Sequence, residues 1–264
     1  MDSCKHFILR AELHNRRKGA ELQSCLFERE FHIKFLGKSR QDAIFYDPNL
    51  KMHFENPSAI AYRYEIEINN TTTLCGGELD KSADFIRRIN YMYDWIQLKV
   101  SLSGNITAIE NKEELKNQWK KIKSTLIKDY EGEAVDACLQ KIDQRFAGEK
   151  KVWTEIYHYV NFGLLFPPIP HKHNSRWSQT RLIEFSEYEE ESFEEQIIYE
   201  KTEKGLRHYR VIIQAREGST TVLQQYAGQI IMAENSLLPV KTNIETVFHK
   251  EGIANQWYFH IETY

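Results

Sequence analysis

Alternation of apolar and polar residues over long segments is the feature that most constrains how this chain folds. It is clearest in residues 60–68, where Ile60, Tyr62, Tyr64, Ile66 and Ile68 fall on one face and Arg63, Glu65 and Glu67 on the other. A strand of this kind has one buried and one solvated face, which is typical of an antiparallel sheet covered on a single side. Alternation fills residues 5–70 and 177–264, whereas helical periodicity is confined to residues 80–166.

Individual strands and helices can be placed from these two periodicities. We expect strands at residues 7–14, 24–36, 43–46, 50–54 and 60–68, a hairpin within residues 95–109, and further strands near residues 177–186, 193–201, 206–216, 220–233, 240–249 and 253–263. Apolar residues three or four apart predict helices at residues 80–94, 111–130, 133–146 and 150–161. Arg29 interrupts the apolar face of the second strand, which indicates a bulge or a side chain that extends to solvent.

The order of strands, helices and strands predicts an α+β fold. We expect a single domain, residues 1–264, because each strand set alone would leave an apolar face uncovered. Its parts are strands in residues 5–70, a mainly helical insert with one hairpin in residues 80–166, and a strand meander in residues 177–264. A sheet of about 10 to 11 twisted strands curls or splits rather than staying flat. We therefore expect a large curved antiparallel sheet, an open half-barrel, wrapped around three to four central helices.

The charge of the chain bears on nucleic-acid binding, and the spacing of its cysteines bears on whether they form disulfides. The chain carries 35 Lys and Arg residues against 38 Asp and Glu, and its net charge of -3 provides no general attraction for nucleic acid. Its four cysteines, Cys4, Cys25, Cys75 and Cys138, form no C-x-x-C pair. Cys25 lies among apolar strand residues, so we expect a buried free thiol there, although the even count leaves two disulfides open.

Targeting signals are missing from this sequence. The N-terminal residues contain no apolar signal core, and no apolar run approaches the roughly 20 residues that cross a bilayer. We therefore expect a cytoplasmic protein without a transmembrane segment.

The closing meander carries a pattern shared with a known group of proteins. It runs Tyr226–Ala227–Gly228–Gln229–Ile230–Ile231–Met232 and then Glu234–Asn235–Ser236–Leu237–Leu238–Pro239–Val240–Lys241. A Gly-led strand, a polar turn, Leu-Pro and a new strand recur in periplasmic lipoprotein carriers of the LolA/LppX type, which residues 206–264 therefore resemble. The resemblance implies a curved sheet with an apolar hollow. It does not imply lipoprotein transport, because such carriers are exported and this sequence shows no export signal.

His171 and His173 form the only close histidine pair, and Trp177 follows them. Alternate residues on a strand can face one metal ion, but this pair lies in a loop that has no Cys, Asp or Glu immediately beside it. We interpret His171, His173 and Trp177 as candidate ligand- or partner-binding residues and assign no metal, cofactor or catalytic residue. A nearby group of carboxylates is interpreted as a solvated turn, with an acid–base pair or a docking site for a basic partner as the alternatives. Its members are Glu184, Glu187, Glu189, Glu190, Glu191, Glu194 and Glu195.

Three functional hypotheses follow. The sequence has no G-x-S-x-G elbow, P-loop, G-x-G-x-x-G fingerprint or H-E-x-x-H helix, which disfavours an enzyme without excluding one. We expect a non-enzymatic binding protein whose aromatic-lined concave sheet holds an apolar ligand such as a lipid or acyl chain. The alternatives are a protein-interaction or structural component of a multiprotein assembly, with its hollow filled by its own helices, and an enzyme with scattered site residues. An empty apolar chamber would favour ligand binding, and a filled one would favour the protein-interaction component.

Overall fold

The computed structural model describes residues 4–17, 23–40, 60–75, 80–148, 152–159, 161–184, 192–215, 222–250 and 253–264. The strands in these ranges are β1 (Cys4–Arg17), β2 (Gln23–Arg40), β3 (Ile60–Cys75), β4 (Trp95–Ser101), β5 (Ile106–Ile109), β6 (Ser178–Glu184), β7 (Ser192–Glu203), β8 (Leu206–Ala215), β9 (Val222–Ala233), β10 (Pro239–Lys250) and β11 (Ile253–Thr263). The α-helices are α1 (Asp80–Asn90), α2 (Lys112–Asp129) and α3 (Glu133–Ala147). The expected strands at residues 43–46 and 50–54 lie outside the described residues.

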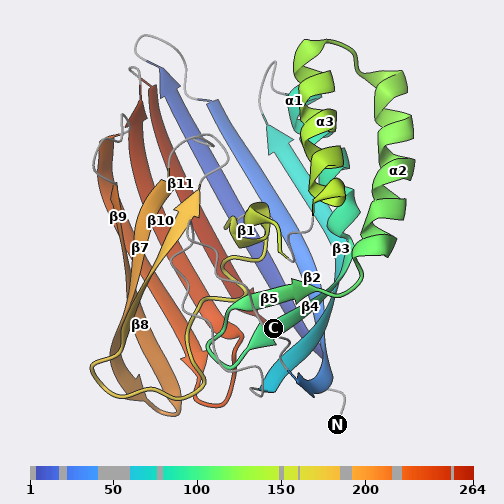
Figure 1. Ribbon diagram of the computed structural model, residues 1–264. Coiled ribbons are helices and arrows are strands. Elements are labelled where there is room, and N and C mark those ends of the chain that lie inside the picture. The colour runs from blue at the N-terminus through green and yellow to red at the C-terminus, as the bar shows by residue number, and fades with distance from the viewer. Residues whose placement is uncertain are drawn as a thin grey trace.

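All eleven strands belong to one antiparallel sheet, in the order β5-β4-β3-β2-β1-β11-β10-β9-β8-β7-β6. The sheet is not closed, and β5 and β6 are its edges. At its centre β1 pairs with β2 on one side and with β11 on the other, so the first and last strands join the two strand sets (Figure 1). The large antiparallel sheet expected from the sequence is therefore confirmed.

The two faces of the sheet follow the predicted alternation. On β1, Phe7, Leu9 and Ala11 are fully buried, while Arg10 and Glu12 between and beside them are exposed. Each large apolar side chain buried in this way contributes about 1.5–3 kcal/mol relative to exposure. The face that carries Phe7 and Leu9 is called the core face below, and the opposite face the outer face.

The three α-helices stand together beside one half of the sheet, next to β3 (Figure 1). Their main contacts are with β3, with one another and with η2 (Tyr91–Tyr93), a 3-10 turn that follows α1. Trp119 on α2 is buried, and its Nε1 donates a hydrogen bond to Asp143 Oδ1 on α3 at 2.8 Å. Among the helices of the described residues, none is long and apolar enough to cross a membrane.

The expected fourth helix, at residues 150–161, is wrong. Thr154–Tyr157 form a short 3-10 turn (η3), after which the chain folds back, and Gly163 N donates to His158 O at 3.2 Å. A Cβ on Gly163 would lie 1.9 Å from Tyr157 O, so this reversal requires glycine. The periodicity of Val152, Ile156 and Tyr159 was misleading, because it spans only a few residues and the backbone reversal at Gly163 leaves no periodic signal.

Residues 153–159 and 161–170, called the inner segment, supply much of the core. Its buried apolar residues are Trp153, Ile156, Tyr157, Tyr159, Phe162, Leu164, Leu165, Phe166 and Ile169. The ring of Phe162 lies 6.1 Å from that of Phe31 on β2, and the ring of Tyr159 lies 5.2 Å from that of Phe259 on β11. The inner segment therefore packs against strands of both halves of the sheet.

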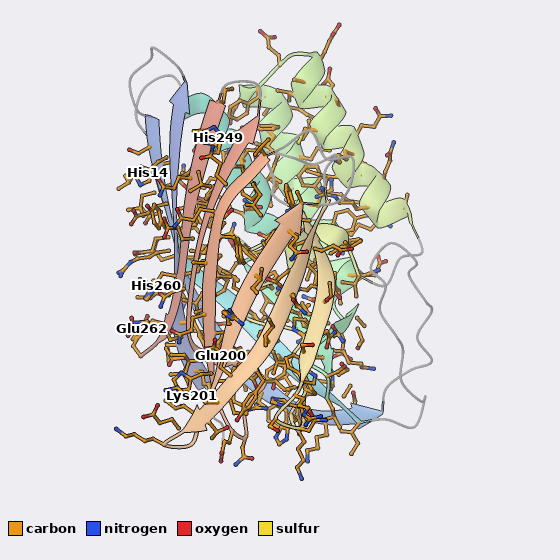
Figure 2. All side chains as sticks on the ribbon, turned by 90° about the vertical axis from the view of Figure 1, so that its left-hand side faces the viewer. His14, Glu200, Lys201, His249, His260 and Glu262 are labelled. Atoms are coloured by element: carbon orange, nitrogen blue, oxygen red, sulfur yellow. The ribbon has the colours of Figure 1, made fainter. Side chains whose placement is uncertain are left out.

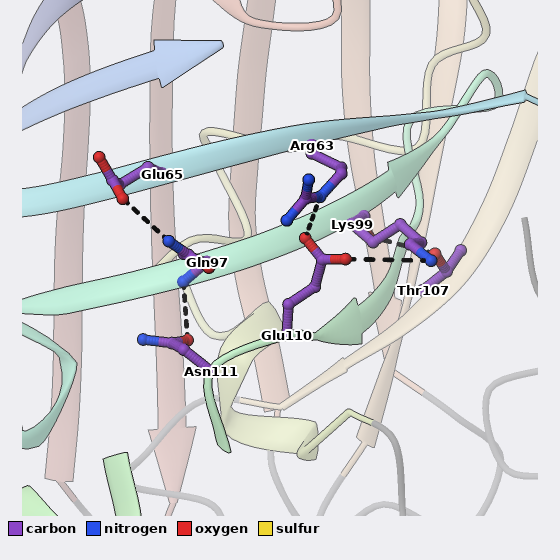
Figure 3. A network of polar contacts seen from close by, with 7 residues as sticks. All are labelled: Arg63, Glu65, Gln97, Lys99, Thr107, Glu110 and Asn111. Atoms are coloured by element: carbon purple, nitrogen blue, oxygen red, sulfur yellow. Dashed lines mark hydrogen bonds and ion pairs between the residues drawn. The ribbon is translucent and has the colours of Figure 1, made fainter. Parts of the chain in front are cut away.

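A polar network joins β3, β4 and β5 to the start of α2 (Figure 3). Glu110 accepts a hydrogen bond from Arg63 Nε at 2.6 Å and lies 3.9 Å from Lys99 Nζ. Gln97 donates its side-chain amide to Glu65 at 2.9 Å and its backbone N–H to Asn111 Oδ1 at 2.8 Å. The edge hairpin is thus joined to β3 by charged side chains, and to the start of α2 by the hydrogen bond of Gln97 with Asn111.

The state of Cys25 differs from the one expected from the sequence. Cys25 is disulfide-bonded, so the prediction of a free thiol at this position is wrong. Its register partner in the β2–β3 ladder is Cys75. Cys4, by contrast, carries a free and exposed thiol. The sequence alone could not reveal this disulfide, because its geometry depends on how strands far apart in the chain are aligned.

Candidate functional site

A pocket of about 260 Å³ opens at the end of the sheet where β1 begins. Residues of β1, β2, β3 and the turn between β9 and β10 line it: Lys5, Ile33, Phe35, Lys38, Tyr62, Tyr64, Asn235, Ser236, Leu237 and Leu238. Ile33 and Tyr64 are buried and lie on the core face of their strands. The pocket is therefore an opening onto the core face rather than a dent in the outer surface.

A β-bulge on β2 shapes this pocket. Phe35 pairs with Tyr64, but the next register pairs are Gly37 with Arg63 and Lys38 with Tyr62, so Leu36 is the additional residue. An additional residue reverses the alternation that follows it, which brings Lys38 to the same face as Phe35. Gly37 has φ +116°, a value that glycine adopts readily and other residues rarely do.

Aromatic rings form one wall of the pocket. The ring of Phe35 lies 5.5 Å from that of Tyr62 and 5.7 Å from that of Tyr64. Tyr64 in turn contacts Phe166 of the inner segment, with ring centroids 5.4 Å apart. Phe35 remains 37% exposed although it lies on the core face. Phe35 and Tyr62 therefore give this opening an apolar wall that solvent can reach.

Two lysines place positive charge at the same opening. Lys5 Nζ donates to Ser236 Oγ at 3.3 Å, and burial lowers the pKa of Lys5. Lys38 Nζ lies 5.7 Å from the centre of the Tyr62 ring. Within the described part of the chain, neither lysine forms an ion pair with a carboxylate. An anion bound here would stabilise the charged form of Lys5, which burial disfavours.

The inner segment is held in place by a buried polar cluster. Arg181 on β6 and Glu195 on β7 form an ion pair, and Arg181 also donates to Gly163 O at 3.1 Å. Tyr159 donates to Glu195, and its hydroxyl oxygen lies 3.0 Å from that of Tyr226 on β9. Burial, reinforced by the Glu195 carboxylate, raises the pKa of Tyr159, so this hydroxyl keeps its proton.

A second buried contact fixes the inner segment to the other half of the sheet. Arg29 on β2 is 1% exposed, and its guanidinium donates to Asn161 Oδ1 at 3.0 Å. Burial lowers the pKa of Arg29 to about 10, and burial raises the pKa of nearby Asp94 to about 6. The expected bulge at Arg29 is wrong, because β2 keeps its alternation there and pairs with β1 without interruption; the nearby register shift leaves Asn69 of β3 as the additional residue. The alternative of a solvent-directed side chain is wrong, because Arg29 points into the core.

The structure separates the three residues that the sequence singled out. His173 and Trp177 stack, with ring centroids 5.0 Å apart, and Tyr199 and Tyr209 complete an aromatic cluster around His173. His173 Nε2 lies 2.6 Å from the Tyr209 hydroxyl. His171 is not part of this cluster: its backbone N–H donates to Leu102 O at 2.9 Å, and its carbonyl accepts from Arg207 at 3.2 Å.

A second hollow lies on the outer face, over β9, β10 and β11. It measures about 480 Å³, is open to solvent, and includes Ala227, Asn243, Glu245, Tyr258 and His260 in its lining. Figure 2 shows His260 and neighbouring Glu262 on the side of the sheet away from the helices. His260 is already hydrogen-bonded to Asn243 at 2.6 Å and to Glu262 at 3.1 Å. Because its polar groups are paired with one another, this hollow is a weaker candidate than the pocket at Lys5.

The pocket residues were not identified from the sequence. Tyr62 and Tyr64 were placed on the apolar face of their strand, but nothing in the alternation indicated that this end of the face is open. Lys5 lies on the same face as Phe7 and Leu9, and a lysine that continues an apolar face was the available signal. Comparison with protein-family models and with curated proteins gives no match for this chain.

Proposed function

We propose that this protein binds a small amphiphile that has one apolar chain and an anionic head, with its site in the pocket at Lys5. The observation that carries the proposal is the meeting of Phe35 and Tyr62 with the ammonium groups of Lys5 and Lys38 at one opening. The apolar chain would contact the two rings, and the head would lie between the two lysines. Ligand pockets are commonly about 300–1,000 Å³ in volume, so a pocket of 260 Å³ suits a short ligand or one part of a longer one.

The rest of the fold supports this proposal. We infer that the sheet is an open half-barrel whose core face surrounds the inner segment, as the likeness to LolA/LppX-type carriers implies. Phe162, Leu164 and Leu165 of the inner segment are fully buried against that face. The ligand is therefore placed at the rim of the sheet, where the inner segment ends its coverage, rather than deep beneath it.

Binding of a fluorescent fatty acid to the full chain tests the proposal. Reversal of both charges in a Lys5→Glu, Lys38→Glu variant should weaken binding at least tenfold, which corresponds to about 1.4 kcal/mol. Phe35→Ala should also weaken binding, because it removes an apolar wall. Lys34→Glu is the matched control, since Lys34 lies on the same strand but is exposed on the outer face. Unchanged binding in the double variant, or equal weakening by the control, would refute the proposal.

A component of a protein assembly is the second candidate function. The packing of the inner segment favours it, because residues such as Phe162 and Leu165 occupy the core face that an internal ligand would need. This candidate predicts that purified protein carries no extractable lipid and that Phe35 is covered by a protein partner. Crosslinking from a photoreactive residue at position 35 would separate the two functions, since it yields either a lipid adduct or one defined protein adduct.

The disulfide at Cys25 bears on the location of the protein. Disulfides persist in oxidising compartments and are rare in the cytosol. We therefore infer an oxidising compartment, in place of the cytoplasmic location expected from the sequence. Thiol labelling in intact cells tests this inference: Cys25 should resist alkylation before reduction and should react after it.

A further inference from the structure

A cluster of metal-ligating side chains lies on the outer face, away from the pocket at Lys5. Cys4 and His6 are two residues apart on β1, and His32 is the register partner of His6 on β2. One ligand atom from each residue can be chosen so that all three lie within 4.8 Å of one another. The two imidazole rings are in edge contact, with centroids 4.0 Å apart.

The strand geometry explains why these side chains converge. Residues i and i+2 of a strand share a face, and directly opposite residues of paired strands have Cβ atoms about 4.5–5.5 Å apart. Phe7, Phe31 and Ile33 alternate with the cluster and are buried on the core face. Cys4, His6 and His32 are therefore all directed to the outer face, where solvent and ions have access.

We propose that Cys4, His6 and His32 bind a zinc ion. A thiolate and two neutral imidazoles are ligands that Zn²⁺ prefers, and three protein ligands leave a fourth position for water. Zinc–nitrogen distances of about 2.0–2.1 Å and zinc–sulfur distances of about 2.3 Å place tetrahedral ligand atoms roughly 3.4–3.7 Å apart. The ligand atoms lie within 4.8 Å of one another, so changes of about 1 Å by side-chain rotation would bring them to this spacing.

Glu67 extends the site to a third strand. It is exposed on the outer face of β3 and is the register partner of His32. A carboxylate beside a zinc-bound histidine accepts the second ring N–H and fixes the orientation of the imidazole. Glu67 is thus a positioning residue for His32, and the site joins β1, β2 and β3 by contacts on the outer face.

Zinc titration of the full chain by calorimetry, without reductant so that the Cys25 disulfide is kept, tests the proposal. The expected result is one Zn²⁺ per chain, with affinity reduced at least about 100-fold by Cys4→Ser, His6→Ala or His32→Ala, and about 10- to 100-fold by Glu67→Gln. Co²⁺ in place of Zn²⁺ should give a thiolate-to-metal charge-transfer band that Cys4→Ser removes.

His14→Ala and Cys138→Ser are matched controls, because His14 lies on the outer face of the same strand and Cys138 lies on α3.

Folding of each variant is checked by its melting temperature without metal. Zinc should raise the melting temperature of the wild type and of the two control variants, but not that of the three ligand variants. The proposal is overturned if the wild type binds no zinc, or if binding survives in all three ligand variants. It is also overturned if His14→Ala weakens binding as much as His6→Ala does.

Discussion

Arg181 and Glu195 face each other across the β6–β7 ladder and form an ion pair that is buried from solvent. Through Tyr159 and Gly163 O the same pair contacts the inner segment, so one charged contact joins an edge of the sheet to its core. Removal of one member of a buried ion pair leaves the other charge without compensation. The pair therefore provides a direct test of how firmly the inner segment is held.

Glu195→Gln should lower the free energy of unfolding by about 3–5 kcal/mol, because it leaves the Arg181 guanidinium buried without a counter-charge. Urea denaturation measures this change. The control is Glu200→Gln on the same strand, where the pair with Arg210 is exposed and should contribute about 1 kcal/mol or less. A similar, small effect of the two substitutions would show that the Arg181 charge does not depend on Glu195.

Asp94 should make the protein less stable as the pH rises from about 4 to about 6. Burial raises its pKa from 3.8 to about 6, so in this interval the folded protein holds a proton that the unfolded chain has released. The stability that is present below pH 3.8 is lost as the pH rises through the pKa of Asp94 in the folded protein, by about 2–3 kcal/mol in total. Asp94→Asn should remove this component of the pH dependence, measured by urea denaturation at each pH. An unchanged pH profile in Asp94→Asn would contradict the assignment.

His173 should contribute a pH dependence of the opposite sign. Burial lowers its pKa from 6.5, so the unfolded chain takes up a proton at a higher pH than the folded protein does. The stability that is present above pH 6.5 is then lost as the pH falls through the pKa of His173 in the folded protein. NMR titration of the His173 ring should give a midpoint below 6.5, and His173→Gln should flatten the acid side of the stability profile. A midpoint above 6.5 would show that the aromatic cluster does not disfavour the charged ring.

The architecture was accessible from the sequence because both periodicities are strong and local. The alternation around Tyr62, Tyr64 and Ile66 defined a strand and its buried face, and the structure confirms both. The position of the inner segment was not accessible, because the fold-back at Gly163 depends on the approach of its backbone to Tyr157 O. Such an approach leaves no periodic pattern.

Polar residues inside the core were interpreted too readily as solvated. Glu195 lies between Phe193 and Ile197 on the buried face of β7, so alternation itself marked it as a core residue. The local density of glutamates obscured that signal, and the partner Arg181 is supplied by another strand. The cluster of Cys4, His6 and His32 was missed for a related reason, since the proximity of His6 and His32 follows only from the β1–β2 register.

Gly104 should be far less tolerant of alanine than Gly205, although both have positive φ, +84° and +75°. At Gly205 an added Cβ meets nothing within 4 Å, so Gly205→Ala should cost only the left-handed backbone penalty of about 1–2 kcal/mol. At Gly104 the Cβ would lie 2.4 Å from Pro167 O and 2.8 Å from Ile169 N, both backbone atoms that cannot rotate away. Gly104→Ala should therefore cost at least about 2 kcal/mol more, because it separates the β4–β5 hairpin from the inner segment.

Urea denaturation of the two alanine variants measures this difference as a shift in midpoint at constant slope. Gly205→Ala controls for backbone strain, so the excess loss in Gly104→Ala reports the contact with Pro167 and Ile169 alone. Equal losses in the two variants would mean that the hairpin can move away from the inner segment at little cost. In that case the inner segment would be held by its contacts with Arg29 and Arg181, and the edge strand β5 would contribute little to its position.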